Sequence, residues 1–466
     1  MVPSHWSSLY VSRRGGKLWR DGQLYRFVGA NIFYLAWLGA KDSGGQPRLK
    51  RELDRLQALG VTNVRILAAA EGPDVARQPC AEWCREDHGH CMNGRWDTHG
   101  WQCECTGCSF CNSSAARLGG VLFKHCPGVA SMGKIVPSLQ PFAGIVNEYM
   151  LRGLDYALDA LASRGMNAVL ILNNMWAWSG GFASYVLWAT GEAPPRMGPD
   201  ATDADWQAHQ DFASRFYGTA KAVEIWFGYI RQLLGRRNSV NGRLYREDPA
   251  IMAWELANEP RALKKKNAYQ TWIRQASGLI KSLDCLHLVT LGSEGATAFP
   301  SYVNNNLQSD HEHVDFVTLH IWPQNYLWYN PMTARDVGQA FAHSKAYIEA
   351  ALNASAAMGK PLVIEEFGIA RDNGSHSTTA STKLRDAYFK QMCTFLASTT
   401  SQTSGLNFWS WAGEGRPRAA KTIWQPGDEW TGDPPHERQG WYSVYNTDRS
   451  TLTVLSECSS LFATQR

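Results

Sequence analysis

The chain contains no hydrophobic stretch of about 18 residues, the length that a membrane-spanning helix requires, so we expect no membrane segment. It also has little excess charge. The net charge is +4, and the densest basic run is Lys264-Lys265-Lys266. Nucleic acids bind to extended basic patches, so we expect no nucleic-acid partner. The first residues, from Met1 to Trp6, have no apolar signal core. We expect either a sequence written after a signal was removed or a chain that never carried one.

Tryptophan is unusually abundant in this sequence. The chain has 20 Trp among 466 residues, together with 44% hydrophobic and 19% charged residues, a composition typical of a soluble globular protein with a large core. Indole faces pack well against the C–H groups of sugar rings. The composition therefore indicates sugar binding, although a Trp-rich core explains it equally well.

Cysteine is distributed unevenly, because eight of the 11 cysteines lie between Cys80 and Cys126. An even number at this density predicts a disulfide-stapled module and an oxidising, extracellular location. Zinc is the alternative, with Cys105, Cys108 and Cys111 among the candidate ligands. The spacing does not form two CxxC pairs, so we favour disulfides and expect no metal.

The other cysteines are Cys285, Cys393 and Cys458, an odd number that predicts at least one free thiol if no other chain is bonded. Three N-x-S/T sequons agree with secretion: Asn112, Asn353 and Asn373.

Short apolar runs recur along the chain, and each is followed by polar residues. Near-continuous apolar runs predict strands that are buried on both faces, and hence a parallel sheet. The eight runs are Arg26–Phe33, Asn63–Ala69, Asn167–Asn174, Ile251–Asn258, Leu288–Ser293, Asp315–Trp322, Pro361–Phe367 and Gly405–Trp411.

Amphipathic segments lie between several of these runs and predict helices. They are Arg48–Ala58, Asn147–Arg164, Lys221–Leu234, Tyr269–Leu283 and Asp336–Ala357. Eight strands alternating with helices predict an α/β fold of the (β/α)8 TIM-barrel type. The alternative is a doubly wound open sheet, but no Gly-rich phosphate loop follows the first strand. We expect one catalytic domain over residues 1–466, with residues 80–126 as an insertion in the loop after strand two.

The active site of such a barrel forms at the carboxyl ends of its strands. Six of the predicted strands carry reactive or hydrogen-bonding residues there or just beyond. A single one of them could be a packing residue, but the set is hard to explain by packing. The residues are Arg65, Asn173, Asn174, Trp176, Trp178, Asn258, Glu259, His320, Trp322, Glu365, Glu366, Trp409 and Trp411.

Two carboxylates on facing strands fit glycoside hydrolysis, in which one protonates the leaving oxygen and the other attacks the anomeric carbon. Strands four and seven face each other across the barrel mouth, which selects Glu259 and Glu366. Glu255 lies deeper, and we expect it to be a buried acid paired with a base such as Arg65. Glu365 and Glu366 are neighbours on one strand, so alternation predicts that only one of them faces the interior.

The combination of these motifs resembles glycoside hydrolase family 5, and within it the endo-β-1,4-mannanases. The similar stretches are WELANEPR (Trp254–Arg261), NNMWAWSGG (Asn173–Gly181) and GDPPHERQGWYSVY (Gly432–Tyr445). The family's acid/base glutamate follows an Asn, as in Asn258-Glu259. Its nucleophile opens a Glu-Phe-Gly motif, as in Glu366-Phe367-Gly368. The resemblance covers almost the whole chain except the cysteine-rich segment.

The resemblance implies roles for the catalytic and substrate-binding residues. Glu259 would be the acid/base and Glu366 the nucleophile, giving retention of configuration. The other implied sugar-site residues are Arg65, which would keep Glu366 ionised, Asn258, His320, Trp409 and Arg261. Trp176, Trp178 and Trp328 are candidates for distal subsites, with core packing as the alternative for each.

One position departs from the family pattern. Many members have a Tyr two residues after the strand-six His, and its hydroxyl bonds the nucleophile. Trp322 stands there in this chain. An indole N–H donates but cannot accept a hydrogen bond, so the tuning of the nucleophile differs or another residue supplies the hydroxyl.

The resulting prediction is a secreted, monomeric endo-β-1,4-mannanase that acts on β-mannan without a cofactor. Three alternatives have the same glutamate pair: a β-1,4-glucanase or glucomannanase, an exo-acting mannosidase and a transglycosylase. A non-catalytic carbohydrate-binding barrel is the alternative from another class, and the intact glutamate pair argues against it.

Overall fold

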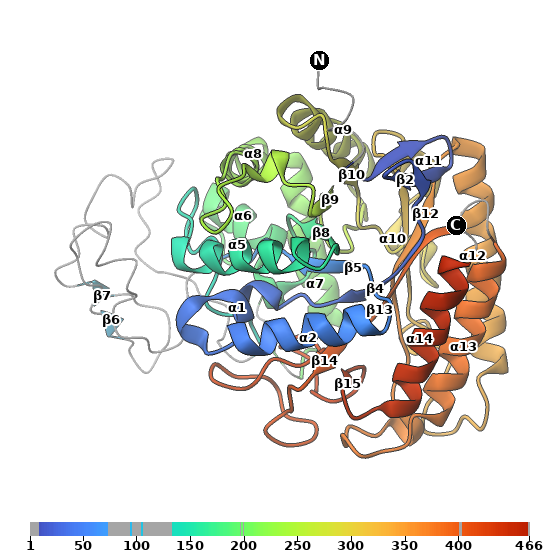
Figure 1. Ribbon diagram of the computed structural model, residues 1–466. Coiled ribbons are helices and arrows are strands. Elements are labelled where there is room, and N and C mark those ends of the chain that lie inside the picture. Colours follow the sequence, from blue (N-terminus) through green and yellow to red (C-terminus); the bar gives the residue numbers. More distant parts are fainter. Residues whose placement is uncertain are drawn as a thin grey trace.

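The computed structural model describes residues 9–72, 94–95, 104–105, 133–195, 197–198, 200–399 and 403–464. At its centre lie eight parallel strands, hydrogen-bonded in the order β10-β9-β8-β5-β4-β13-β12-β11 (Figure 1). Seven lie within the predicted runs, and the last begins at Thr403 instead of Gly405. The strands are β4 (Phe27–Asn31), β5 (Asn63–Leu67), β8 (Asn167–Ile171), β9 (Ile251–Glu255), β10 (Leu288–Thr290), β11 (Val317–Ile321), β12 (Leu362–Phe367) and β13 (Thr403–Phe408).

The two ends of this sheet, β10 and β11, approach each other and nearly close the barrel. The backbone N–H of Asp315 donates to the carbonyl of Val289 at 2.7 Å. The hydroxyl of Thr290 donates to the carbonyl of Phe316 at 3.1 Å. The predicted (β/α)8 barrel is therefore confirmed, and its strand ends meet at one rim.

Helices surround the sheet (Figure 1). The five predicted ones are confirmed as α2 (Gln46–Ala58), α5 (Glu148–Ala162), α8 (Ala220–Leu234), α9 (Lys266–Leu283) and α12 (Gly338–Met358). The sequence analysis missed α1 (Leu35–Gly39), α6 (Gly181–Thr190), α7 (Asp203–Ala213), α10 (Pro300–Val303), α11 (Leu307–Asp310), α13 (Lys383–Ser398) and α14 (Arg449–Ala463).

Helix α5 shows why these segments are helical. The side chain of Asn147 caps its first turn by accepting a hydrogen bond from the backbone N–H of Met150 at 3.3 Å. Its leucine stripe is fully packed: Leu151, Leu154, Leu158 and Leu161 are all buried. An amphipathic stripe with a good cap is stable here because the stripe covers the barrel wall.

A small antiparallel sheet at the N-terminus belongs to the opposite end of the barrel and was not predicted. It consists of β1 (Ser12–Arg14), β2 (Lys17–Arg20) and β3 (Gln23–Leu24). Leu18 packs in one buried cluster with Phe27 of β4 and Val363 of β12. This end of the barrel is therefore apolar, and the polar strand ends lie at the other.

The segment after β13 returns to the barrel rim. Its first residues form β14 (Trp411–Gly413), which pairs in parallel with β15 (Val444–Tyr445). Beyond β15, one carboxylate oxygen of Asp448 accepts hydrogen bonds from Arg371 at 2.6 Å and from Arg385 at 2.8 Å. All three side chains are buried. These contacts fix the loop between β14 and β15 relative to the end of β12.

The predicted cysteine-rich module, Cys80 to Cys126, lies outside the described residues except for two short strands. These strands, β6 (Gly94–Arg95) and β7 (Glu104–Cys105), pair antiparallel. The disulfide and zinc interpretations of this module both stay predictions.

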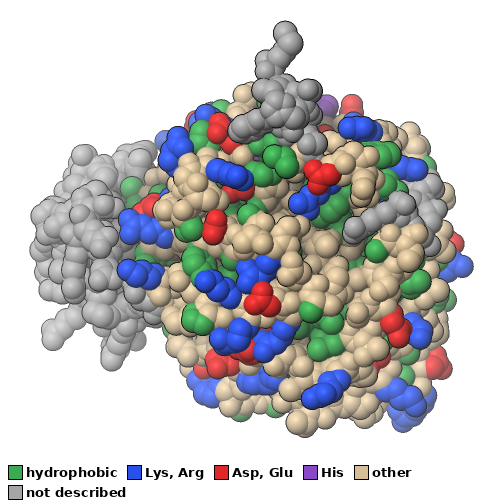
Figure 2. Space-filling model, viewed as in Figure 1, with side chains coloured by type: hydrophobic (Ala, Val, Ile, Leu, Met, Phe, Trp, Pro, Cys, Tyr) green, Lys and Arg blue, Asp and Glu red, His purple; other side chains and the backbone are tan. Residues whose placement is uncertain are grey.

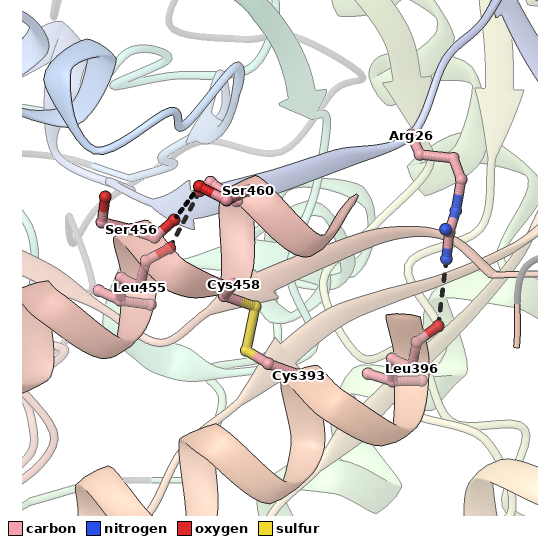
Figure 3. Close-up of a disulfide and its surroundings, with 8 residues drawn as sticks. Arg26, Cys393, Leu396, Leu455, Ser456, Cys458 and Ser460 are labelled. Atoms are coloured by element: carbon pink, nitrogen blue, oxygen red, sulfur yellow. Dashed lines mark hydrogen bonds between the residues drawn. A yellow bond between two sulfur atoms is a disulfide. The ribbon is translucent and has the colours of Figure 1, made fainter. Parts of the chain in front are cut away.

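One disulfide lies in the described part of the chain. Cys393 of α13 and Cys458 of α14 are bonded, with Cα atoms 5.4 Å apart (Figure 3). Cys285 is an exposed free thiol. The odd cysteine expected among these three is therefore Cys285.

The surface of the face shown in Figure 2 has Lys and Arg side chains intermingled with Asp and Glu. No large patch of one sign is visible there. Among the described helices, none combines the length and apolarity that a membrane crossing requires.

Candidate active site

The imidazole of His320, at the end of β11, joins the two predicted catalytic glutamates. Its Nδ1 lies 2.8 Å from Glu259 Oε1 and 3.3 Å from Glu366 Oε2. One ligand-type atom from each of these three residues lies within 4.8 Å of the other two. All three side chains are buried, with Glu259 8% and Glu366 2% exposed. The structure thus brings together the pair that strand order had predicted.

Both glutamates of the β12 pair face this imidazole, and the expectation that only one faces inward was wrong. Glu365 Oε2 lies 3.7 Å from His320 Nε2, on the opposite side of the ring from Glu366. The cause is a register shift: Leu319 pairs with Ile364, but His320 pairs with Glu366. Glu365 is the extra residue of a bulge, which breaks the alternation of side chains.

Arg65 on β5 lies at the base of the site. Its guanidinium binds Glu255 through two hydrogen bonds, of 2.7 Å and 2.5 Å, and it also donates to Glu366. The predicted pairing of buried Glu255 with Arg65 is confirmed. Asn31 of β4, which the sequence analysis missed, accepts a further bond from Arg65 at 3.1 Å. Two carboxylates therefore share one fixed cation.

Asn258 lies directly beside this cation. Its side-chain oxygen accepts a hydrogen bond from Arg65 at 2.8 Å, and its amide nitrogen donates to Asn174 at 3.2 Å. Both ends of the amide are therefore positioned by the protein, and the second N–H and the second oxygen lone pair are not used by these two bonds. Its expected bond to a sugar 2-hydroxyl stays a prediction.

Glu259 follows β9 with a backbone φ of 51°, a left-handed conformation that is unfavourable for a residue with a side chain. Its backbone N–H donates to Gly292 at 2.9 Å. The indole N–H of Trp176 donates to its Oε2 at 2.6 Å. Strained residues of this kind cluster at functional sites, where the surrounding structure holds them in place.

Arg261 lies on the same side as Glu259. Its guanidinium carbon lies 4.8 Å from the ring centre of Trp176. Its Nε donates to Glu294 at 2.5 Å and its Nη1 to Gln210 at 2.8 Å. Arg261 is thus a fixed cation beside the predicted acid/base. Glu294, just beyond β10, is a further residue that sequence reasoning missed.

The charges around the pair are strongly coupled. Burial raises the pKa of Glu366 to about 7, although His320 and Arg65 oppose this shift. Burial would also raise the pKa of Glu259, but hydrogen bonding and charge from His320, with Arg261 and Trp176, lower it to about 2. Between these values the pair holds one proton, as expected for two carboxylates around one site.

His320 is the cation between them. Burial alone would lower its pKa, but the charge of Glu366, the hydrogen bond to Glu259 and the nearby carboxylate of Glu365 raise it to about 10. The protonated ring carries an N–H on both nitrogens. The expectation that no metal is required stays a prediction.

Aromatic rings line the side of Glu366. Trp409, just after β13, stacks on Phe33 with ring centres 6.0 Å apart. Trp322 packs edge-on against Trp409 at 5.9 Å and against Tyr442 at 5.0 Å. The hydroxyl of Tyr442 donates to Asn325 at 3.0 Å. Within the described residues no hydroxyl donates to Glu366, which is bound by Arg65 and lies beside His320.

Trp178 and Trp328 both pack against other rings. Trp178 packs on Phe33 and stacks on His436 at 6.3 Å. Trp328 stacks on His343 of α12 at 5.5 Å. Trp206 of α7 lies beside Trp176, with the two ring centres 5.5 Å apart. The subsite roles of Trp178 and Trp328 stay predictions.

Glu437 is a site residue that sequence reasoning missed. Burial raises its pKa to about 8, with the charges of Asp433, Glu259 and Glu366 adding to the shift. Its Oε2 is buried without a hydrogen-bond partner among the described residues. It stands in the Gly432–Tyr445 stretch noted for its resemblance, but nothing in the sequence distinguishes it from other loop glutamates.

A barrel with two facing glutamates at its rim, a shared histidine and an arginine beneath them is the catalytic framework of a glycoside hydrolase. A family model described as GH family 5 beta-mannosidase-like matches residues 8–87 and 128–465, and the chain belongs to this family. The match leaves out residues 88–127, most of the stretch expected as an insertion.

Named relatives agree with this assignment. A putative mannan endo-1,4-beta-mannosidase 9 from Oryza sativa subsp. japonica is 30% identical over 69% of this chain and 73% of its own length. A mannan endo-1,4-beta-mannosidase 4 from Solanum lycopersicum is 27% identical over 59% of this chain and 67% of its own length. The chain is thus a mannanase-like glycoside hydrolase.

Solved structures show the same fold. A glycoside hydrolase family 5 mannosidase from Rhizomucor miehei has a TM-score of 0.79 and 29% identity, covering 98% of this chain and 99% of that chain. An endo-1,4-beta-mannanase from the same organism has a TM-score of 0.63 and 20% identity, with the same coverage, which shows the fold alone.

Proposed function

We propose that the protein hydrolyses β-1,4-linked mannosides with retention of configuration, using Glu366 as nucleophile and Glu259 as acid/base. The observation that supports this is their spacing around His320, with a carboxylate oxygen of each within 4.8 Å of the other. Retaining enzymes keep their carboxyl groups about 5–5.5 Å apart, whereas inverting enzymes need about 6.5–9.5 Å for a water molecule.

In the first step Glu366 bonds to the anomeric carbon, the bond to the leaving oxygen breaks, and that oxygen takes the proton of Glu259. In the second step water gives a proton to Glu259, its oxygen bonds to the anomeric carbon, and the bond to Glu366 breaks. Arg65 and His320 stabilise the negative charge that returns to Glu366 when its bond to the anomeric carbon breaks.

The first step needs the proton on Glu259, yet the pKa values of the free protein favour Glu366. A bound sugar reverses this preference in our proposal. The glycosidic oxygen must approach Glu259 where Trp176 donates to it, and loss of that bond makes the ionised form of Glu259 less stable. The proton can then move to Glu259 while Arg65 keeps Glu366 ionised.

We further propose that the terminal mannose is the preferred point of attack. Glu259 and Glu366 are almost fully buried, and the loop between β14 and β15 brings Glu437 to the same charge cluster. Carboxylates this deeply buried suit the end of a chain better than its middle. The raised pKa of Glu437 keeps its carboxyl group neutral near pH 7, so its O–H can donate to a sugar hydroxyl.

Cleavage inside the chain is the second candidate, and it is supported by the names of the rice and tomato relatives. Product analysis separates the two. With mannohexaose labelled at its reducing end, removal of terminal residues releases mannose and leaves a ladder that shortens by single units. Early labelled mannobiose and mannotriose, with a rapid fall in the viscosity of mannan, would support the endo mode instead.

Glu437→Ala tests the role of Glu437 directly. We expect slower release of mannose from mannobiose, by roughly 10-fold or more, because the sugar hydroxyl loses its hydrogen-bond donor. Glu437→Gln is the matched control, since its amide N–H can still donate and should preserve most of the rate. Products longer than the substrate would indicate transglycosylation. Hydrolysis of cello-oligosaccharides without cleavage of any mannoside would reject the proposed substrate class.

Secretion is also proposed, and it is supported by the Cys393–Cys458 disulfide and by exposed sequons at Asn353 and Asn373. Asn373 stands in a turn, which is a favourable place for glycosylation. A loss of mass on treatment of the native protein with a peptide-N-glycosidase, abolished in an Asn373→Gln, Asn353→Gln variant, would support secretion. The monomeric state stays a prediction.

A further inference from the structure

Glu365 is a buried carboxylate that the mechanism above does not use. It is fully buried, and neither of its oxygens has a hydrogen-bond partner among the described residues. An ionised carboxylate in such a place is costly unless a cation faces it. His320 is the cation that it faces, with Nε2 at 3.7 Å, and this nitrogen has no other partner in the described chain.

The imidazole of His320 therefore has a carboxylate at each nitrogen. Nδ1 faces Glu259 and Glu366, and Nε2 faces Glu365. A neutral imidazole carries one N–H and would direct a lone pair at one of these sides. Only the doubly protonated ring donates in both directions.

We propose that Glu365 is a positioning residue that keeps His320 as an imidazolium, so that its Nδ1–H always points at the catalytic pair. Glu365 touches neither the sugar nor the reacting atoms in this role, and acts through His320. The inference rests on the proposed function, because it assigns a purpose to Nδ1–H in that reaction.

The remaining charges near the ring belong to the strands on either side. Arg65 of β5 interacts with Glu365 and Glu255 but already binds Glu255 and Glu366 directly. Glu294, beyond β10, binds Arg261. Each of these acids is directly bound by an arginine, whereas His320 is the one cation within 4.0 Å of Glu365 among the described residues. The bulge at Glu365 is what allows two adjacent residues to reach opposite nitrogens.

The rival arrangement is a neutral imidazole whose Nε2 accepts a hydrogen bond from a protonated Glu365. Nitrogen-15 spectra of histidine-labelled protein distinguish the two, because the chemical shifts of both ring nitrogens report which of them carries a proton. A His320→Asn variant identifies the signal. We expect both nitrogens to remain protonated to pH 9 or above in the unmodified protein. A neutral ring at pH 8 would overturn the proposal without any variant.

Glu365→Gln removes the charge and keeps the shape. We expect His320 to lose its proton about 1 to 3 pH units lower than in the unmodified protein, the effect of removing one opposite charge at this range. We also expect kcat to fall at least about 10-fold, with a smaller change in KM. Glu365→Asp is the matched control, because it retains the charge and should restore much of the His320 titration. Thermal melting of each variant confirms that it is folded.

An unchanged titration of His320 in folded Glu365→Gln would overturn the proposal. The nitrogen spectra do not depend on turnover, so the role of Glu365 and the proposed function can be rejected independently of each other. If Glu366→Ala abolishes mannoside hydrolysis while His320 is neutral, only the role of Glu365 fails. If no mannoside is cleaved but His320 titrates as expected, only the proposed function fails.

Discussion

Trp176 donates its indole N–H to Glu259 Oε2 at 2.6 Å, and this bond connects the rim of the barrel to its proposed acid/base. The indole also carries the guanidinium of Arg261 on its face. One ring therefore positions both a proton acceptor and a neighbouring cation. Trp176 therefore affects the stability of the ionised form of Glu259.

Trp176→Phe removes the N–H and keeps an aromatic face for Arg261. A hydrogen bond to a charged group contributes about 1.5–3 kcal/mol, so we expect the pKa of Glu259 in the free protein to rise by roughly 1 to 2 units, as measured by the carbon-13 shift of its carboxyl group. Trp188→Phe is the matched control, since that ring packs on Tyr185 within α6. Equal shifts in both variants would show that the effect does not come from the bond to Glu259.

Substitution of the two glutamates tests retention. With an aryl β-mannoside whose leaving group needs no proton, we expect azide to restore activity to Glu259→Ala and to give a β-mannosyl azide. Glu366→Ala should give an α-mannosyl azide, because azide then attacks the opposite face in a single displacement. Proton nuclear magnetic resonance of the products distinguishes the two anomers. The same anomer from both variants would contradict the assignment of roles.

Much of this site was predictable because strand ends are the least ambiguous positions of a barrel. Each central strand is buried on both faces and appears in the sequence as a short apolar run. The ends of these runs could therefore be located from the sequence, and with them Arg65, Glu259, His320 and Glu366. The pairing of Glu255 with Arg65 followed from elementary electrostatics, since an acid inside an apolar run needs a buried cation.

Other features depend on contacts that no local pattern encodes. The bulge at Glu365 arises from the register between β11 and β12. Glu437 reaches the site because β14 pairs with β15 and Asp448 binds two arginines from distant segments. Helix α6 was missed because its residues from Gly181 to Trp188 are all buried, which removes the amphipathic period.

The Cys393–Cys458 disulfide predicts a stability effect that is separate from catalysis. It joins α13 to α14 across 65 residues (Figure 3). Closing a loop of this length stabilises the fold by about 4 kcal/mol through the entropy of the unfolded chain. We expect the Cys393→Ser, Cys458→Ser double variant to melt several degrees lower, with kcat at 25 °C little changed.

Cys285→Ser is the control for this measurement. The Cys285 thiol is exposed and unbonded, so its removal should leave the melting temperature unchanged. A reductant should lower the melting temperature of the unmodified protein more than that of the double variant. The cysteines between Cys80 and Cys126 would contribute to the effect of a reductant if they are bonded. A double variant that melts with the unmodified protein would show that the bond does not form.

The shared proton of the catalytic pair predicts the pH dependence of kcat/KM. The pKa of Glu366 is raised to about 7 and that of Glu259 is lowered to about 2. Below about pH 7 the pair keeps one proton for the leaving oxygen, and above it both carboxylates are ionised. We therefore expect kcat/KM on mannotriose to fall about tenfold per pH unit above pH 7, because the acid is lost. Glu259→Ala with the activated aryl mannoside should lack this alkaline fall, since that reaction needs an ionised nucleophile but no acid. If the variant showed the same alkaline fall in kcat/KM, loss of the shared proton could not be its cause.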